Sequence, residues 1–237
     1  MEALRARMRE FIDEVVIPAE PEGDAALDRL KADAKERGLW ALGHPEEIGG
    51  GGIDLLDFVY LNESIGRSEL GQFAVGSVTM QDAIMLHRFG TPEQQERWLL
   101  PMVAGDIYPS VALTEPEVAG SDPTLIRTTA ELDGDEWVVN GHKWFCTGAD
   151  RAAYTTVFAR TESEAPRHRA MTMIIVPAGT PGFEIVRRIP TMGGTHGSHC
   201  ELRFTDCRVP AENTLGDRGH AFAIAQARLG PGRIFHA

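Results

Sequence analysis

The first hundred residues have hydrophobic positions at the spacing of α-helices. In the first stretch, apolar residues recur at intervals of three and four, at Leu4, Met8, Phe11, Ile12, Val15 and Val16. Such a stripe predicts a helix, and Pro18 is expected to end it. A second helix is predicted from Leu27 to Ala34, with Asp24 as its N-terminal cap and Gly38 just past its end.

Two further segments of this half have clear boundaries. Thr91, Pro92 and Gln94 form a capping box with proline at the first helical position, which predicts the start of another helix. Residues 48–53 contain four consecutive glycines, so this segment is predicted to be a loop. A helical pattern then resumes from Asp54 to Arg67.

From about Tyr108 the pattern changes to short apolar runs that are typical of strands. The clearest runs are residues 154–159, 171–176, 183–186 and 201–204. Proline, glycine and polar loops separate them, which favours a barrel or a sandwich of short strands. The dipeptides Asp133-Gly134 and Asn140-Gly141 suit the positive φ angles of tight turns, so both predict hairpins.

The order of these elements predicts an α+β protein with separate helical and β-rich domains. The expected domains are residues 1–106, which are helical, and residues 107–216, which are rich in strands. Residues 217–237 return to a helical pattern that Asp217 is expected to cap. This last pattern stops inside an apolar segment, and a helical face left without a partner predicts a further domain.

Composition and charge exclude several classes of protein. The chain has 237 residues and a formal charge of −12, which disfavours nucleic acid as a partner. Its longest apolar runs are too short to cross a membrane, and its start lacks the apolar stretch of a signal peptide, so a cytoplasmic location is expected. Three cysteines without C-x-x-C spacing predict reduced thiols, with neither a disulfide framework nor a zinc site.

The segment Leu113 to Asp122 is the first candidate for chemistry. It closes a predicted strand and opens a loop of small residues, where backbone N–H groups and hydroxyls can approach a ligand closely. From the residues alone it is either a cofactor loop or an ordinary strand-to-loop turn. His196 and His199 form an H-x-x-H pattern, but further ligands are lacking and no metal is assigned.

Several stretches together resemble the acyl-CoA dehydrogenase family. Leu113 to Asp122 resembles the family signature T-E-P-x-x-G-S-D, with one additional residue before Ser121, as in a branch of the family. The other similar stretches are Pro45 to Gly50 (P-E-x-x-G-G), Val139 to Trp144 (N-G-x-K-x-W/F), Asp206 to Pro210 (D-x-x-V-P) and Arg228 to Ile234. Their order and spacing also match, and the resemblance covers essentially the whole chain.

The resemblance implies a helical N-terminal domain, a β-barrel middle domain and a C-terminal four-helix bundle, with FAD between the last two. It implies dehydrogenation of an acyl-CoA to trans-2-enoyl-CoA, with an electron-transfer flavoprotein as acceptor and a dimer or tetramer when complete. In the family the catalytic glutamate lies in the third domain, so no residue of this chain is assigned as catalytic. Residues 1–237 alone are therefore expected to bind FAD poorly and to lack appreciable activity.

The resemblance also assigns roles to individual residues. Leu113 and Thr114 match positions that face the pyrimidine end of the flavin. Ser121 matches a serine near the FAD pyrophosphate and the CoA part of the substrate. Arg233 matches an arginine near the substrate and the loop of the catalytic carboxylate.

A second cluster of matches lies in the predicted strand after Asn140. Phe145 matches the aromatic residue that covers one face of the flavin ring, and Thr147 matches the threonine whose hydroxyl meets flavin N5. Cys146, between them, is expected to contact the cofactor through its backbone.

Two alternatives to a dehydrogenase remain open on the sequence. The scaffold can serve as a non-catalytic or heteromeric subunit, because fold does not fix function. It is also shared by flavin-dependent oxidases and hydroxylases. The sequence does not identify the acyl chain of the substrate.

Overall fold

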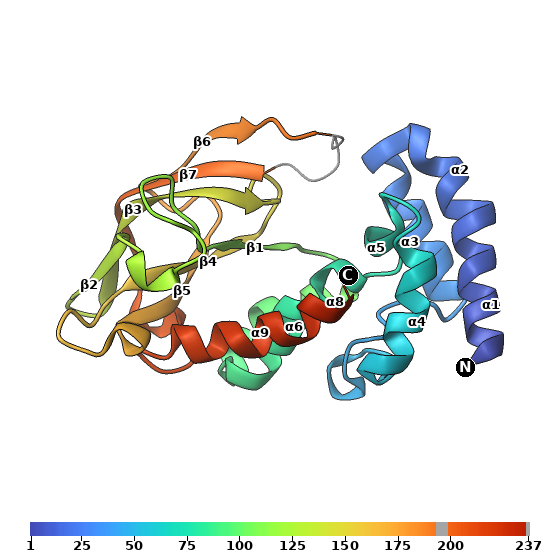
Figure 1. The fold of residues 1–237 in the computed structure, drawn as a ribbon, viewed down its shortest axis with the longest axis horizontal. Coiled ribbons are helices and arrows are strands. Elements are labelled where there is room, and N and C mark those ends of the chain that lie inside the picture. Colours follow the sequence, from blue (N-terminus) through green and yellow to red (C-terminus); the bar gives the residue numbers. More distant parts are fainter. Residues whose placement is uncertain (193–198, 236–237) are drawn as a thin grey trace. The chain divides into compact units, whose positions relative to one another are not determined.

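A computed structural model describes residues 1–192 and 199–235. The chain folds into two compact units, which Figure 1 shows as ribbons. The helical unit consists of Met1–Arg88, Gln95–Asp106 and Ala227–Ala237, and the sheet unit consists of Phe89–Gln94 and Ile107–Gln226. The predicted order of a helical domain followed by a sheet-rich domain is confirmed.

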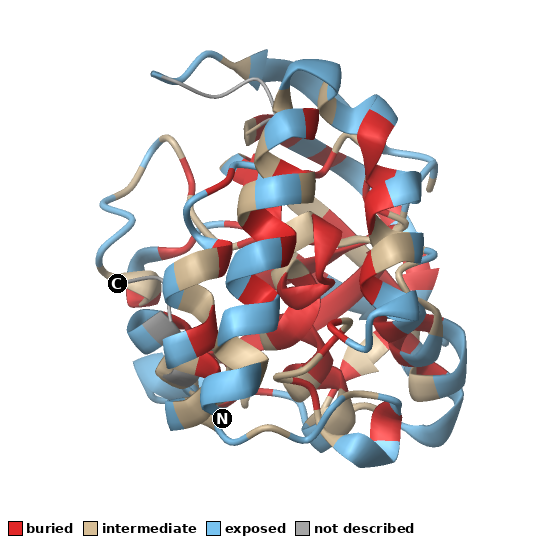
Figure 2. Cartoon of the chain, turned by 90° about the vertical axis from the view of Figure 1, so that its right-hand side faces the viewer, coloured by how far each residue is buried: buried red, intermediate tan, exposed pale blue. Residues whose placement is uncertain are grey.

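The helices of the first 106 residues include those predicted near Leu4–Val16, Leu27–Ala34, Asp54–Arg67 and after Thr91, and also further ones. They are α1 (Glu2–Phe11), α2 (Ile17–Ala19), α3 (Leu27–Glu36), α4 (Leu55–Ile65), α5 (Gly71–Ala74), α6 (Met80–Phe89), α7 (Pro92–Gln94) and α8 (Leu100–Ala104). Their buried apolar side chains form one core, which includes Met8, Phe11, Leu30, Leu61 and Ile65. Figure 2 shows buried stretches alternating with exposed ones along the helices.

Helix ends in this half depart from the sequence prediction at two points. Pro18 does not end the first helix, because a π-helical turn at Ile12–Val16 places it in the first turn of α2, where the missing N–H matters least. The residue directly before α3 (Leu27–Glu36) is Ala26 and not Asp24, and the preceding 3-10 segment Glu20–Ala26 is broken at Gly23, whose backbone is non-helical (φ 60°, ψ −139°).

Other predicted ends are confirmed. Gly38 follows α3 with a left-handed backbone (φ 64°), as expected for a residue just past a helix. Thr91 and Gln94 form the reciprocal capping box, with each side chain bonded to the other residue's backbone N–H at 3.3 and 3.2 Å. Asp54 caps α4 by accepting a hydrogen bond from the N–H of Asp57.

The sheet unit contains one mixed sheet. Its strands are β1 (Pro109–Ala112), β2 (Thr129–Asp133), β3 (Glu136–Thr147), β4 (Tyr154–Arg160), β5 (Met171–Pro177), β6 (Phe183–Ile189), β7 (His199–Pro210) and β8 (Thr214–Leu215). Their order is β6-β7-β3-β2-β4-β5-β8, and β1 also pairs with β4. Within the described residues β6 and β8 stay at opposite ends of this order, so the sheet is not closed into the expected barrel.

Only one of the two predicted hairpins exists, because β3 continues through the second predicted turn. Asp133 and Gly134 do turn the chain from β2 into β3. Asn140 and Gly141 instead lie inside β3, beside a bulge in β7 at Asp206, whose φ is 46°. The Asn140 amide braces that bulge, because it bonds both the backbone N–H and the side chain of Asp206.

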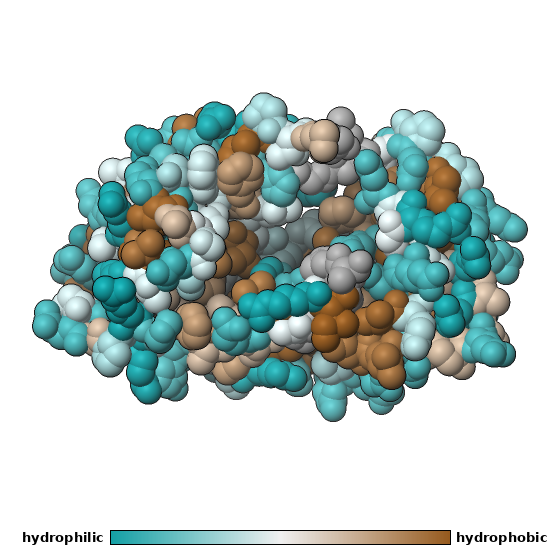
Figure 3. Space-filling model, in the orientation of Figure 1, coloured by the Kyte–Doolittle hydropathy of each residue, from teal (hydrophilic) through white to brown (hydrophobic). Residues whose placement is uncertain are grey.

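The last helix, α9 (Ala221–Phe235), begins in the sheet unit and ends in the helical unit. In the helical unit, Arg228 makes two 3.0 Å hydrogen bonds to the carboxylate of Asp82 on α6. None of the helices in the described part of the chain has the length and apolar character needed to cross a lipid bilayer. Hydrophilic residues cover much of the face drawn in Figure 3, in line with the net charge of −12.

Candidate functional site

The C-terminal end of β3 is distorted by a bulge. Lys143 pairs with Leu202 and Cys146 pairs with Cys200, so Trp144 and Phe145 together face the single residue Glu201 of β7. The bulge gives Phe145 a left-handed backbone with φ 52° and leaves 46% of its surface exposed. A bulky aromatic residue rarely adopts this conformation, and such strain gathers at functional sites.

An exposed hydroxyl lies two residues beyond this ring. Thr147 is exposed, and its Oγ1 lies 2.9 Å from Nδ1 of His199 on β7. The Thr147 carbonyl accepts a hydrogen bond from the Ser110 hydroxyl, which fixes the end of β3 against β1. The ring of Phe145 lies 5.0 Å from that of Trp144 and 6.0 Å from that of His199. Ring and hydroxyl are therefore held in place and open to solvent.

Cys146 lies between these two exposed residues and is fully buried. Its thiol contacts the Trp144 carbonyl at 3.7 Å. Burial raises the pKa of this thiol to about 12, so it stays protonated and unreactive.

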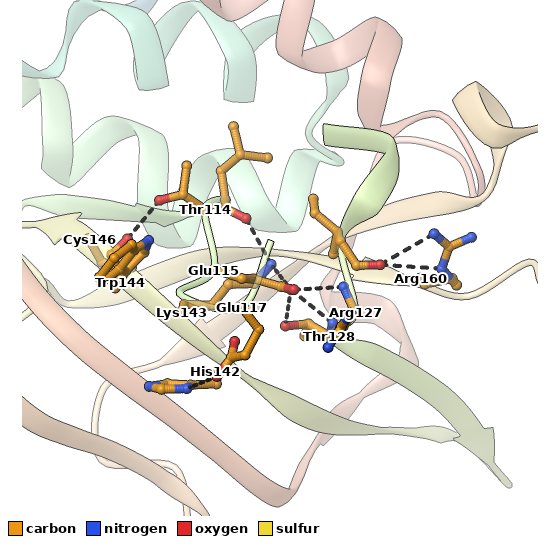
Figure 4. Close-up of polar contacts among 12 residues, drawn as sticks. Thr114, Glu115, Glu117, Arg127, Thr128, His142, Lys143, Trp144, Cys146 and Arg160 are labelled. Atoms are coloured by element: carbon orange, nitrogen blue, oxygen red, sulfur yellow. Dashed lines mark hydrogen bonds and ion pairs between the residues drawn. The ribbon is translucent and has the colours of Figure 1, made fainter. Parts of the chain in front are cut away.

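The loop that follows β1 is bonded to the same bulge. The Thr114 hydroxyl donates to the Trp144 carbonyl at 2.8 Å, and the Trp144 N–H donates to the Thr114 carbonyl at 3.0 Å. One residue earlier, the Leu113 carbonyl accepts from Lys143 Nζ at 3.0 Å. Figure 4 shows these contacts between the loop and β3. Leu113, Thr114, Phe145, Cys146 and Thr147 are thus brought together, as a shared site requires.

A buried ion pair joins the beginning of this loop to β3. Lys143 and Glu115 are 0% and 1% exposed, and Nζ lies 2.9 Å from Oε1. Glu115 also accepts hydrogen bonds from the backbone N–H groups of Arg127 and Thr128 and from the Thr128 hydroxyl. Burial lowers the pKa of Lys143 to about 8 in spite of the Glu115 charge. Burial alone would raise the pKa of Glu115, but Lys143 and these hydrogen bonds lower it.

Two residues further along the loop, Glu117 is attached to the sheet through His142. His142 of β3 lies between Glu117 of the loop and Glu201 of β7, at 2.6 and 2.8 Å. Glu201 is also bonded by Arg187 Nε at 2.6 Å. Partial burial alone would lower the pKa of His142, but the two carboxylates outweigh it and raise this pKa.

The remaining predicted residues lie outside this cluster. Ser121 is exposed on the same loop, where the Asp122 side chain fixes the turn by accepting from the N–H and the hydroxyl of Thr124. Arg233 is an exposed residue of α9 in the helical unit. No group of three His, Cys, Asp or Glu side chains in the described part of the chain could hold a metal, and His196 lies outside the described residues.

Sequence reasoning missed the polar residues that hold the site in place. It assigned no role to Lys143, His142 or His199. A signal existed for Lys143, since Trp137, Val139 and Lys143 are separated by even numbers of residues and so share one face of β3 up to the bulge. The partners of His142 and His199 come from β7, and no local pattern indicates them.

Comparison with known proteins places this geometry in one family. Residues 1–106 match the family description "Acyl-CoA dehydrogenase, N-terminal domain", and residues 110–207 match "Acyl-CoA dehydrogenase, middle domain". The chain belongs to the acyl-CoA dehydrogenase family. Among curated relatives of this chain, "Probable acyl-CoA dehydrogenase FadE2" of Mycobacterium tuberculosis is 40% identical over 98% of the chain. Mouse "Acyl-CoA dehydrogenase family member 10" is 37% identical over 98% of the chain.

Solved structures of the family share the fold. A putative acyl-CoA dehydrogenase from Mycobacterium abscessus superposes with a TM-score of 0.93 at 36% identity, over 99% of this chain. A chain from a structure titled for the electron transferring flavoprotein of Acidaminococcus fermentans is 32% identical, with a TM-score of 0.82. This chain spans 61% of the length of FadE2, 24% of the mouse protein and 64% of the M. abscessus structure.

Proposed function

We propose that this chain forms the flavin-binding face of an FAD-dependent acyl-CoA dehydrogenase, which converts an acyl-CoA to trans-2-enoyl-CoA. The observation that carries the proposal is the exposed ring of Phe145, on a strained backbone, two residues before the exposed hydroxyl of Thr147. An exposed aromatic face and a hydrogen-bonding group on the same strand end suit the isoalloxazine ring, which offers a π-face and a polar edge.

The residues around the bulge fit the flavin chemically. Phe145 would offer a face for stacking, and the Thr147 hydroxyl would meet N5. The main chain of Leu113 and Thr114 and the hydroxyl of Thr114 would lie at the pyrimidine end, and Cys146 would contribute its backbone. These groups are neutral hydrogen-bonding groups, which suits a ring that gains negative charge on reduction.

Two further predicted residues have proposed roles apart from the bulge. Ser121 would bond the FAD pyrophosphate or the CoA moiety through its hydroxyl, without adding a repulsive charge. Arg233 would help to hold an anionic group near the substrate. No residue of this chain is proposed as the catalytic base.

In the mechanism, bound FAD supplies the acceptor for a hydride from the substrate β-carbon. The work of this chain is positioning. The bulge fixes Phe145 and Thr147, while Glu115 and Lys143 fix the loop that carries Thr114. Rigid placement of such groups lowers the barrier because little reorganisation is needed during the reaction.

The proposed partners are an acyl-CoA and an electron-transfer flavoprotein, and the proposed assembly is a homo-oligomer. Two solved relatives are titled as paired chains, "Tcur3481-Tcur3483 steroid ACAD" and the "ChsE4-ChsE5 complex" of M. tuberculosis. They favour, as a second candidate, a heteromeric assembly in which this chain contributes part of a shared site. We also propose residues 1–106 and 107–216 as separate domains.

The decisive test is anaerobic reduction of the purified full protein by saturated acyl-CoAs of several chain lengths. Bound flavin and loss of its visible absorbance with at least one acyl-CoA are expected. A purified protein that contains no flavin, or one whose flavin is reduced by no acyl-CoA, would refute the proposed dehydrogenase activity. Rapid reoxidation of the reduced flavin by oxygen would instead favour an oxidase, and activity only after addition of a second chain would favour the heteromer.

A further inference from the structure

His142 makes contacts that only its charged form can satisfy. Its Nδ1 lies 2.6 Å from Oε1 of Glu117, and its Nε2 lies 2.8 Å from Oε1 of Glu201. A neutral imidazole carries one N–H, and an ionised carboxylate only accepts hydrogen bonds. Both contacts are therefore made together by the imidazolium, in which each ring nitrogen is a donor.

The surroundings of His142 contain charges of both signs. The charged groups that face it or its partners are Glu117 of the loop, Glu201 and Arg203 of β7, Arg187 of β6 and Arg127 at the edge of the adjoining cleft. The two carboxylates touch the ring directly, whereas Arg187 binds the other oxygen of Glu201. The direct contacts favour the charged ring, and the raised pKa of His142 agrees with this.

The contact between His142 and Glu117 holds the middle of the loop, because the other anchors lie at its beginning and its end. Glu115 fixes its beginning through Lys143 and Thr128, and Asp122 fixes its end through Thr124. In the part of the chain that the structure describes, Glu117 is the residue between these anchors whose side chain bonds to the sheet. The intervening stretch leads directly to Ser121.

We propose that protonated His142 is a positioning residue that fastens the middle of the loop 113–122 to β3 and β7, and that the stretch between Glu115 and Asp122 loosens when His142 loses its proton. The proposal rests on the proposed function only in assigning the loop 113–122 to the flavin site. The direction of the pH dependence follows from the protonation of His142. The attachment is complete while His142 is charged and is lost as the pH rises through the pKa of His142 in the folded protein.

The test is hydrogen exchange of the segment 113–122 in the full protein, with and without flavin, corrected for the intrinsic pH dependence of exchange. In the wild type, protection of this segment should be high at about pH 6 and should fall as the pH rises through the raised pKa of His142. His142→Gln cannot make both ionic contacts, so its loop should exchange roughly three- to five-fold faster at the lower pH and lose most of the pH dependence.

Two further variants separate positioning from a general loss of structure. His142→Arg keeps a permanent charge with donors for both carboxylates, so it should restore protection and remove the pH dependence. Glu117→Gln should loosen the loop as His142→Gln does. Arg208→Gln, which breaks exposed ion pairs to Asp133 and Glu136 on the same sheet, is the control and should leave the loop unchanged.

The outcomes are distinct. Wild-type protection of the loop in His142→Gln, or a pH dependence that survives in His142→Arg, would overturn the proposal. A loop that responds as expected in a protein that binds no flavin would support the role of His142 and refute the proposed function. In a protein that does bind flavin, weaker flavin binding by His142→Gln than by His142→Arg would support both.

Discussion

Lys143 is a lysine that the fold has removed entirely from solvent. Its ammonium group is balanced by Glu115, and each of these groups needs the other. Lys143→Met should destabilise the protein by about 3–5 kcal/mol, because it leaves a carboxylate buried without its partner. The measurement is the free energy of unfolding in urea. Arg208→Met, at an exposed ion pair of the same sheet, should change that free energy far less, and equal effects would contradict the argument.

Phe145 carries backbone strain that can be measured apart from its ring. Phe145→Ala and Phe145→Gly both remove the ring, but only alanine retains a side chain in the left-handed conformation. The glycine variant should therefore unfold with a free energy higher by about 1 kcal/mol. Both variants should bind flavin more weakly than the wild type does. Equal stability of the two variants would show that residue 145 is not strained.

At the scale of elements, sequence reasoning succeeded where both partners of a contact are close in the chain. The capping box joins Thr91 to Gln94, and the hairpin at Gly134 joins neighbouring strands, so a short motif contains all the information. Asn140 fails this condition because its partner, Asp206, is 66 residues away. A dipeptide that favours hairpins was therefore used to brace a bulge, and only the tertiary structure decides between the two.

Gly141 shows why glycine is required at that point of β3. A Cβ at this position would overlap the hydroxyl of Thr128, which bonds Glu115. Gly141→Ala should destabilise the protein by about 1–3 kcal/mol, measured by thermal or urea unfolding. Gly134→Asn is the matched control, because no atom lies near a Cβ there and asparagine tolerates a positive φ. A similar loss in both variants would point to the loss of glycine flexibility instead.

At the scale of the whole molecule, the three cysteines give a simple measure of the integrity of the sheet. Cys146, Cys200 and Cys207 are all buried, and burial raises the pKa of Cys207 to about 11. A thiol reagent at mildly alkaline pH should therefore label none of them in the native protein and all of them in denaturant. Mass spectrometry after labelling gives the count. Rapid labelling of the native protein would mean that the sheet opens locally around β3 and β7.

The pairing of β3 with β7 also sets the order of events in folding. Trp137 of β3 lies opposite Val209 of β7, so this contact closes a long stretch of chain, whereas β2–β3 and β4–β5 are local pairs. Local pairs form sooner because less chain entropy is lost before the contact is made. During synthesis, β3 is therefore expected to keep one unpaired edge until β7 has left the ribosome. Because the bulge at Phe145 is defined by the pairing with β7, we expect residue 145 to reach its final conformation late in folding.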